Sequence, residues 1–223
     1  GMANPRWFKE SPELAWGFYG HRLNLYRKTD PHPGFSLLLK WINEQNLSAF
    51  VFTSNVDGHF QQSGFPGHAV NECHGSLMHL QCVDQCGQEI WPVSPDLRIE
   101  IDEKTLHALD PLPACPGCGG LARPNILMFS DWEWDPARTN EQGGRLDKWL
   151  RENGNSSLCI IELGAGPSIP TVRITCEQAW KSSGGTLLRI NPRDPQVPKG
   201  AHSLAMGAED ALRAIEEIRT GRR

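Results

Sequence analysis

Apolar residues recur three or four positions apart in the N-terminal part of this chain, a spacing that places them on one face of a helix. Residues 11–26 and 33–46 carry this pattern, and each stretch has a proline at its start, where a helix tolerates one. His32 is expected to be a capping or loop residue. We expect further helices at residues 57–63, 139–152, 170–182 and 209–220.

Short runs of apolar and β-branched residues predict strands at residues 47–53, 69–73, 157–163, 186–190 and 203–206, and residues 126–129 form a further apolar run. The run at 157–163 is almost continuously apolar, as in a strand buried on both faces, and Cys159 within it is expected to be a small core residue. A glycine-rich turn, a helix and another strand follow this run. This βαβ order predicts an α/β fold with a parallel sheet.

The composition is typical of a soluble globular protein. The chain has 223 residues, of which 39% are hydrophobic and 22% charged, and this length suits one domain or one domain carrying a small insertion. No apolar run approaches the length of a membrane span and no signal-peptide pattern opens the chain, so we expect a cytoplasmic protein. Gly1, before Met2, is interpreted as the remnant of an expression tag.

The charge pattern bears on the class of partner. The net charge is −4 and like charges do not form blocks. Neither nucleic acid nor a membrane surface is therefore an expected partner. The sequence leaves the oligomeric state open.

Four of the seven cysteines are spaced for metal binding. An odd number of cysteines argues against a disulfide framework, whereas Cys82 and Cys86 form one close pair and Cys115 and Cys118 another. Four thiolates complete a tetrahedral coordination sphere, so we predict structural zinc in a module of residues 77–121. Four unliganded thiols, the alternative, would leave this polar insert without a core. A hydrolytic zinc enzyme is disfavoured because no coordination position stays open.

Polar side chains cluster where two predicted strands end. The segment Thr53-Ser54-Asn55-Val56-Asp57-Gly58 ends one strand, and Glu72-Cys73-His74-Gly75 ends the next. Ligands of open α/β sheets bind beyond the carboxyl ends of strands, and Asn55 and Asp57 would point the same way in an extended backbone. Turn chemistry explains the first segment equally well. Both interpretations stay open at this point.

Taken in order, these segments resemble those of the sirtuins, the NAD-dependent protein-lysine deacylases. The resemblance covers most of the chain from about residue 4 onward, and it is specific as an ordered set rather than in any single segment. It rests on Thr53 to Gly58, Gly64, Glu72 to Gly75, the four cysteines with Gly119 and Gly120, Arg123-Pro124, Phe129-Ser130-Asp131, Gly164 to Pro170, and Ile190-Asn191.

The resemblance implies an architecture and a reaction. A Rossmann-like domain of residues 1–76 and 122–223 would bind NAD, and the zinc module of residues 77–121 would be inserted into it. An acyl-lysine protein or peptide would lie between the two. The acyl oxygen would attack C1′ of the nicotinamide ribose as nicotinamide leaves, and the acyl group would end on ADP-ribose.

The resemblance also implies roles for individual residues. His74 would act as general base on a ribose hydroxyl, a task that suits an imidazole near neutral pH. Asn55 and Asp57 would assist catalysis by positioning the nicotinamide ribose and a water. Phe129 and Ser130 would bind the acyl-lysine. NAD would be bound by Thr53, Asn55, Asp57, Gly164, Gly166, Ser168 and Asn191.

The sequence departs from the family pattern, above all before Asn4, where the family has a Gly-Ala-Gly phosphate loop. We expect either that Met2 is an internal start of a longer protein or that diphosphate binding and activity are weak. The family strand carrying this loop would lie between the strands at 47–53 and 157–163. These two strands must therefore pair directly, or something else must fill the space.

Smaller departures indicate a divergent bacterial-type branch, with altered acyl preference or with ADP-ribosyl transfer. They are Ser54, Ser130-Asp131 and Gly164-Ala165-Gly166. A catalytically silent, zinc-stabilised module that binds ADP-ribose, NAD or a partner protein is the alternative function. Nicotinamide release separates the two, because a binding module releases none.

Overall fold

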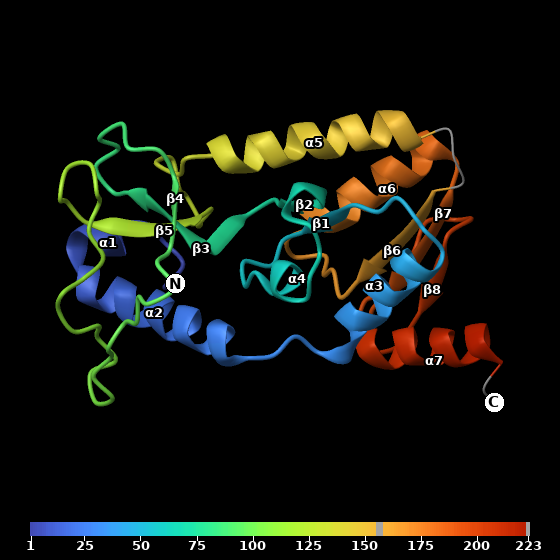
Figure 1. Cartoon of the computed structure of the whole chain (residues 1–223), viewed down its shortest axis with the longest axis horizontal. Helices are drawn as coiled ribbons and strands as arrows, with labels where there is room; N and C mark the ends of the chain where they lie inside the picture. Colours follow the sequence, from blue (N-terminus) through green and yellow to red (C-terminus); the bar gives the residue numbers. More distant parts are fainter. Residues whose placement is uncertain (155–157, 222–223) are drawn as a thin grey trace. The chain divides into compact units, whose positions relative to one another are not determined.

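The computed structural model describes residues 1–154 and 158–221 (Figure 1). Contacts within the chain divide it into two compact units. Unit 1 comprises Gly1–Asp30, Asn55–His59 and Glu72–Gln142, and unit 2 comprises Pro31–Ser54, Phe60–Asn71 and Gly143–Arg223.

Unit 1 packs two N-terminal helices against a small antiparallel sheet. Trp16, which is fully buried, anchors the longer helix, and its Nε1–H donates to the carbonyl of Ala122 at 2.9 Å. The shared core contains Phe8, Leu23 and Leu77. The helices are α1 (Trp7–Glu10) and α2 (Pro12–Lys28), and the strand order is β4 (Trp91–Pro92), β3 (Gly75–Cys82) and β5 (Ala122–Ile126).

The bounds of unit 1 differ from those of the predicted zinc module, residues 77–121. A Cβ built on Gly17 of α2 would lie 2.0 Å from the carbonyl oxygen of Leu106 in the insert. The N–H of Ala108 donates to the carbonyl of Glu13, also on α2, at 2.8 Å. Because helix and insert touch this closely, they pack as one body, which sequence motifs alone did not indicate.

Unit 2 contains the predicted parallel sheet. The strands β6 (Cys159–Leu163), β7 (Thr186–Ile190) and β8 (His202–Leu204) pair in that order, all parallel. Helix α6 (Thr171–Ser183) connects β6 to β7 and packs on them, and α3 (Pro33–Glu44) packs beside α7 (Ala208–Thr220) (Figure 1). The βαβ arrangement and the α/β fold class are therefore confirmed.

The remaining elements are short, apart from one helix. β1 (Val51–Thr53) and β2 (Val70–Glu72) form a two-stranded sheet, and α4 (His59–Gln62), a 3-10 helix (Gly67–Ala69) and α5 (Ala137–Asn153) complete the described elements. His32 caps α3, as expected, by accepting a hydrogen bond from the N–H of Gly34 at 3.1 Å. No helix in the described ranges combines the length and apolar character that a membrane span requires.

β6 is an edge strand, which corrects two predictions. In the described part of the chain β6 pairs only with β7, and β1 lies in a different sheet, so the strands predicted at 47–53 and 157–163 do not pair. Glu162 is the buried residue of β6, whereas Cys159 is exposed. The predictions that this strand is buried on both faces and that Cys159 lies in the core were therefore wrong. A strand is buried only where other elements cover it. Residue 157, in the predicted strand, lies outside the described residues.

Candidate functional site

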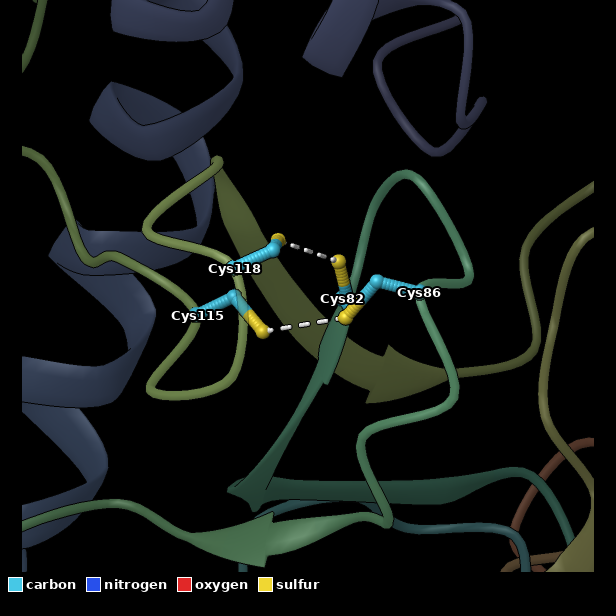
Figure 2. Close-up of side chains that lie close together, drawn as sticks. All are labelled: Cys82, Cys86, Cys115 and Cys118. Atoms are coloured by element: carbon cyan, nitrogen blue, oxygen red, sulfur yellow. Dashed lines mark hydrogen bonds between the residues drawn. The ribbon is translucent and has the colours of Figure 1, made fainter.

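Four cysteine side chains of unit 1 point toward one another (Figure 2). Their Sγ atoms all lie within 4.8 Å of one another, at 3.7 Å between Cys82 and Cys118 and 3.6 Å between Cys86 and Cys115. A zinc ion bonded to four thiolates at about 2.3 Å sets neighbouring sulfurs about 3.8 Å apart in a tetrahedron. The cluster therefore fits the zinc site that the sequence predicts.

Two thiols of this cluster have opposite pKa shifts. Burial raises the pKa of the Cys115 thiol, but backbone N–H groups, first that of Cys118, outweigh it and lower the pKa to about 7. The Gly120 N–H lowers the pKa of the Cys118 thiol, but neighbouring thiols, first that of Cys86, outweigh it and raise the pKa to about 12. Ionising one thiol thus suppresses the next, and a bound dication removes that penalty.

His74 lies in the turn between β2 and β3 and is partly buried. The N–H of Leu127 donates to its carbonyl at 3.0 Å. The next residue, Gly75, has a φ of 79°, and a Cβ built on it would lie 2.0 Å from the carbonyl oxygen of Asn125. Only glycine fits at this position, so the turn has one backbone conformation. That conformation fixes the position of the His74 Cα and Cβ atoms, from which the imidazole extends.

Asp57 uses its carboxylate to form its own turn. Oδ1 accepts a hydrogen bond from the N–H of His59 at 2.9 Å, and Oδ2 lies 3.8 Å from Nδ1 of the same histidine. This is the turn chemistry that the sequence left open as an alternative. The carboxylate is thereby oriented, and its proposed role in positioning ligands is compatible with the turn.

The segment that carries Asn55 is tied to the strand beginning after His74. The N–H of Leu77, on β3, donates to the carbonyl of Val56 at 2.9 Å. Asn55 itself is exposed. Unit 1 thus holds the predicted catalytic residues on two connected segments, whereas Thr53 belongs to unit 2, where it is buried.

Glu72, two residues before His74, is held by contacts that the sequence did not predict. Its carboxylate pairs with the guanidinium of Arg138 on α5, and 2% of the Glu72 side chain is exposed. Its N–H donates to Oε1 of Gln142 at 3.0 Å, and the hydroxyl of Thr139 donates to its carbonyl at 3.2 Å. The start of α5 thus fixes the segment before His74.

Phe129 and Ser130 lie in the loop after β5. The Phe129 side chain is 66% exposed, and Ser130 has a φ of 56°. The N–H of Phe129 donates to the carbonyl of Ala3 at 3.1 Å, so the loop is anchored where the ring projects. The anchored loop leaves the aromatic ring accessible, and the substrate role of Phe129 and Ser130 stays a prediction.

The loop after β6 exposes bare backbone at the carboxyl edge of the parallel sheet in unit 2. Gly164 has a φ of 67°, and a Cβ built on Gly164 or on Gly166 would meet nothing within 4 Å. Ser168, two residues further, is exposed. The open space over these glycines suits the close approach of a dinucleotide such as NAD, which binds at this edge in related sheets.

Asn191 directly follows β7 and is buried, with 5% of its surface exposed. Its Nδ2 donates to the carbonyl of Ala165 at 2.9 Å, and its Oδ1 accepts hydrogen bonds from the N–H groups of Arg193 and Asp194 at 2.9 Å each. Contact with the adenosine ribose stays a prediction. The hydrogen bonds give Asn191 a second role, in joining the loops that follow β6 and β7.

A sequence model of the Sir2 family matches residues 1–140. An NAD-dependent protein deacylase of Aquifex aeolicus is 32% identical over 198 residues, covering 89% of this chain and 72% of that protein. A probable bifunctional ADP-ribose hydrolase/ADP-ribosyltransferase of Fusarium oxysporum f. sp. cubense is 31% identical over 172 residues, covering 73% of this chain and 28% of that protein. The chain therefore spans about a quarter of the Fusarium protein and most of the Aquifex protein.

Solved structures share the fold. A complex of a mutant Sir2 homologue with ADP-ribose matches with a TM-score of 0.73 at 24% identity, covering 99% of this chain and 79% of that chain. A Sir2 structure with a propionylated peptide matches with a TM-score of 0.69 at 22% identity, covering 100% and 84%. These likenesses confirm the predicted Rossmann-like α/β fold.

Proposed function

Because the chain belongs to the Sir2 family, we propose that it is an NAD-dependent protein-lysine deacylase. The acyl group of a protein lysine passes to ADP-ribose, and nicotinamide is released. The family match over residues 1–140 carries the proposal, and the deacylase name of the Aquifex relative supports it. Acyl-lysine proteins or peptides are the proposed substrates, a class to which the propionylated peptide of a related structure belongs. A cytoplasmic location, and the lack of nucleic-acid and membrane partners, stay predictions.

In the proposed reaction, His74 removes the proton from a ribose hydroxyl, and the fixed turn at Gly75 holds the imidazole in place for that transfer. Bound NAD supplies an electrophilic sugar carbon and nicotinamide as leaving group. Asn55 and Asp57 orient the nicotinamide ribose and a water. Phe129, with its neighbour Ser130, contacts the acyl-lysine.

The remaining proposed NAD contacts lie in unit 2, where glycines at a strand end allow the backbone to approach the cofactor. They are Thr53, Gly164, Gly166, Ser168 and Asn191. Zinc, bound by the four cysteines, stabilises the fold of unit 1 and takes no part in the chemistry, because four thiolates leave no open position.

Nicotinamide release from NAD, with and without an acetyl-lysine peptide, tests the proposal. We expect peptide-dependent release, and a rate about 10²–10⁴-fold lower for His74→Ala, the range of a general base. His21→Ala changes an exposed histidine on α2 and should keep the wild-type rate. Full activity of His74→Ala contradicts the assigned base. No release by the folded, zinc-loaded wild type contradicts the deacylase and favours the silent binding module.

Transfer of ADP-ribose to a protein is a second candidate, favoured by the name of the Fusarium relative, which is 31% identical. Both reactions release nicotinamide, so the products must be identified. Deacylation yields a free lysine and an O-acyl-ADP-ribose, whereas transfer adds ADP-ribose to the acceptor protein. Mass spectrometry of both peptide and small-molecule products separates the two.

A further inference from the structure

A buried network of charged side chains lies beneath the edge of the parallel sheet in unit 2. On β7, Arg189 donates from Nε to Oε1 of Glu162 at 2.6 Å and from Nη2 to its Oε2 at 2.9 Å. The same Nη2 donates to Oε1 of Glu177, on α6, at 3.0 Å. The side chains of Glu162 and Arg189 are 1% and 2% exposed. This pairing fixes β6, β7 and α6 to one another.

Arg173, one turn before Glu177 on α6, extends this network to the two loops above it. Its Nε donates to the carbonyl of Ala165, in the loop after β6, at 2.9 Å. Its Nη2 donates to the carbonyl of Asp194, in the loop after β7. The Arg173 side chain is 12% exposed, and its Nε lies 3.9 Å from Oε1 of Glu162. One guanidinium therefore joins both loops to the buried charges.

The carbonyl of Ala165 is a shared acceptor. It receives hydrogen bonds from Nε of Arg173 and from Nδ2 of Asn191, each at 2.9 Å. It also lies between Gly164 and Gly166, whose backbones have few steric restrictions. Two donors on one carbonyl thus hold a segment that would otherwise sample many conformations.

We propose that Arg173 is a positioning residue of the cofactor site, which holds the loops after β6 and β7 in the conformation that receives the ADP-ribose half of NAD. The inference rests on the proposed function for the identity of the ligand. A loop ordered before binding does not lose its conformational entropy at the moment of binding, so the ligand binds more tightly. The role acts through Ala165 and Asp194 and requires no contact between Arg173 and the ligand.

The hydrogen bonds of Arg189 allow the positioning role of Arg173 to be tested apart from a role in folding. In Arg173→Gln, Arg189 keeps both hydrogen bonds to Glu162 and the bond to Glu177, so the buried pair stays satisfied. We therefore expect the variant to fold, with loops that are less ordered. Arg173→Lys keeps the charge but has a single ammonium in place of the fork that reaches two carbonyls, so it should recover part of the affinity.

Isothermal titration of the full, zinc-loaded chain with ADP-ribose is the test. We expect the Kd of Arg173→Gln to rise about 10-fold, the effect of losing a hydrogen bond from a charged group, with a smaller rise for Arg173→Lys. KM for NAD should rise likewise, while kcat and KM for the acyl peptide stay unchanged. Arg213→Gln, the matched control, removes a 53% exposed arginine of α7 in the same unit and should change neither.

An unchanged Kd in folded Arg173→Gln overturns the inference. If that variant does not fold, a wild-type Kd in Arg173→Lys overturns it instead, because lysine cannot reproduce both contacts. A wild type that binds no ADP-ribose also overturns it. Binding that weakens in the variants, in a wild type that releases no nicotinamide, supports the inference while rejecting the proposed function, so the two failures are distinguishable.

Discussion

The guanidinium of Arg123 donates two hydrogen bonds to the carboxylate of Asp131, and the two side chains are 2% and 0% exposed. Nη2 of Arg123 also donates to the carbonyl of Ile126 at 3.0 Å, and the N–H of Met128 donates to Oδ2 of Asp131 at 3.3 Å. This single buried ion pair therefore fixes both ends of the loop that exposes Phe129.

Replacing Asp131 by Asn should destabilise the protein, because the buried guanidinium of Arg123 loses its counter-charge. Breaking a buried pair from one side costs about 3 kcal/mol in the free energy of unfolding. Urea denaturation measures this loss. Asp96→Asn, at an exposed aspartate of the same unit, should change the free energy by less than about 0.5 kcal/mol. A loss below about 1 kcal/mol for Asp131→Asn would show that the pair does not hold the loop.

The strand before this loop shows why part of the fold escaped prediction. The apolar pattern began at Ile126, yet β5 begins at Ala122 and buries Arg123 and Asn125. Nδ2 of Asn125 donates to Oε1 of Gln81, 44 positions away, at 2.9 Å. Most polar atoms of buried side chains have a hydrogen-bond partner, and such partners come from tertiary structure that periodicity does not encode.

The zinc site makes a metal-dependent stability prediction. Cys118→Ser should lower the zinc content from about one ion per chain and reduce the midpoint of thermal unfolding, because metal binding contributes directly to folding in such sites. Zinc analysis by mass spectrometry, together with thermal denaturation, measures both. Cys159→Ser, at an exposed cysteine outside the cluster, is the control and should leave both unchanged. Full zinc content in Cys118→Ser would exclude that cysteine as a ligand.

Gly75→Ala should unfold or distort the turn that carries His74. The new Cβ would meet the carbonyl oxygen of Asn125 at 2.0 Å, at a φ of 79°. We expect a loss of more than about 2 kcal/mol in unfolding free energy, together with a loss of nicotinamide release.

Gly184→Ala is the matched control for the backbone conformation. Gly184 has a φ of 65°, but a Cβ built there meets nothing within 4 Å. The unfolding free energy of this variant should decrease only by the cost of placing alanine in the left-handed conformation, about 1–2 kcal/mol, and its nicotinamide release should be unchanged. Equal losses in both variants would show that the contact with Asn125 is unimportant.

The site was predictable where local rules decide it, and not where distant residues decide it. The spacing of Cys82, Cys86, Cys115 and Cys118 is sufficient for the zinc site, because a tetrahedral ion needs those ligands from two tight turns. Arg173 gave no comparable signal. Its role depends on carbonyls that the parallel sheet brings near α6, and a surface arginine on a helix has the same sequence pattern.

The protein should lose stability in mild acid because of His79, a residue of β3 whose pKa is lowered in the folded state. Burial, first, and the charge of Arg138 together lower its pKa to about 4, although the charge of Glu72 opposes the shift. The unfolded histidine, with a pKa near 6.5, binds the proton more readily than the folded one. The free energy of unfolding should therefore decrease as the pH falls from about 6.5 to about 4, by on the order of 2 kcal/mol from this group.

The comparison of wild type with His79→Gln isolates that contribution, because other groups that titrate in this range, the zinc thiolates among them, are common to both proteins. Urea denaturation at several pH values between 7 and 4 gives the free energy of unfolding for each. Below pH 6.5 the free energy of unfolding should fall more steeply with decreasing pH for the wild type than for His79→Gln. The difference in slope corresponds to the uptake of up to one additional proton on unfolding, and the two curves should run parallel above pH 7. Parallel curves over the whole range would mean that His79 titrates alike in the folded and unfolded chain, and that its burial does not oppose protonation.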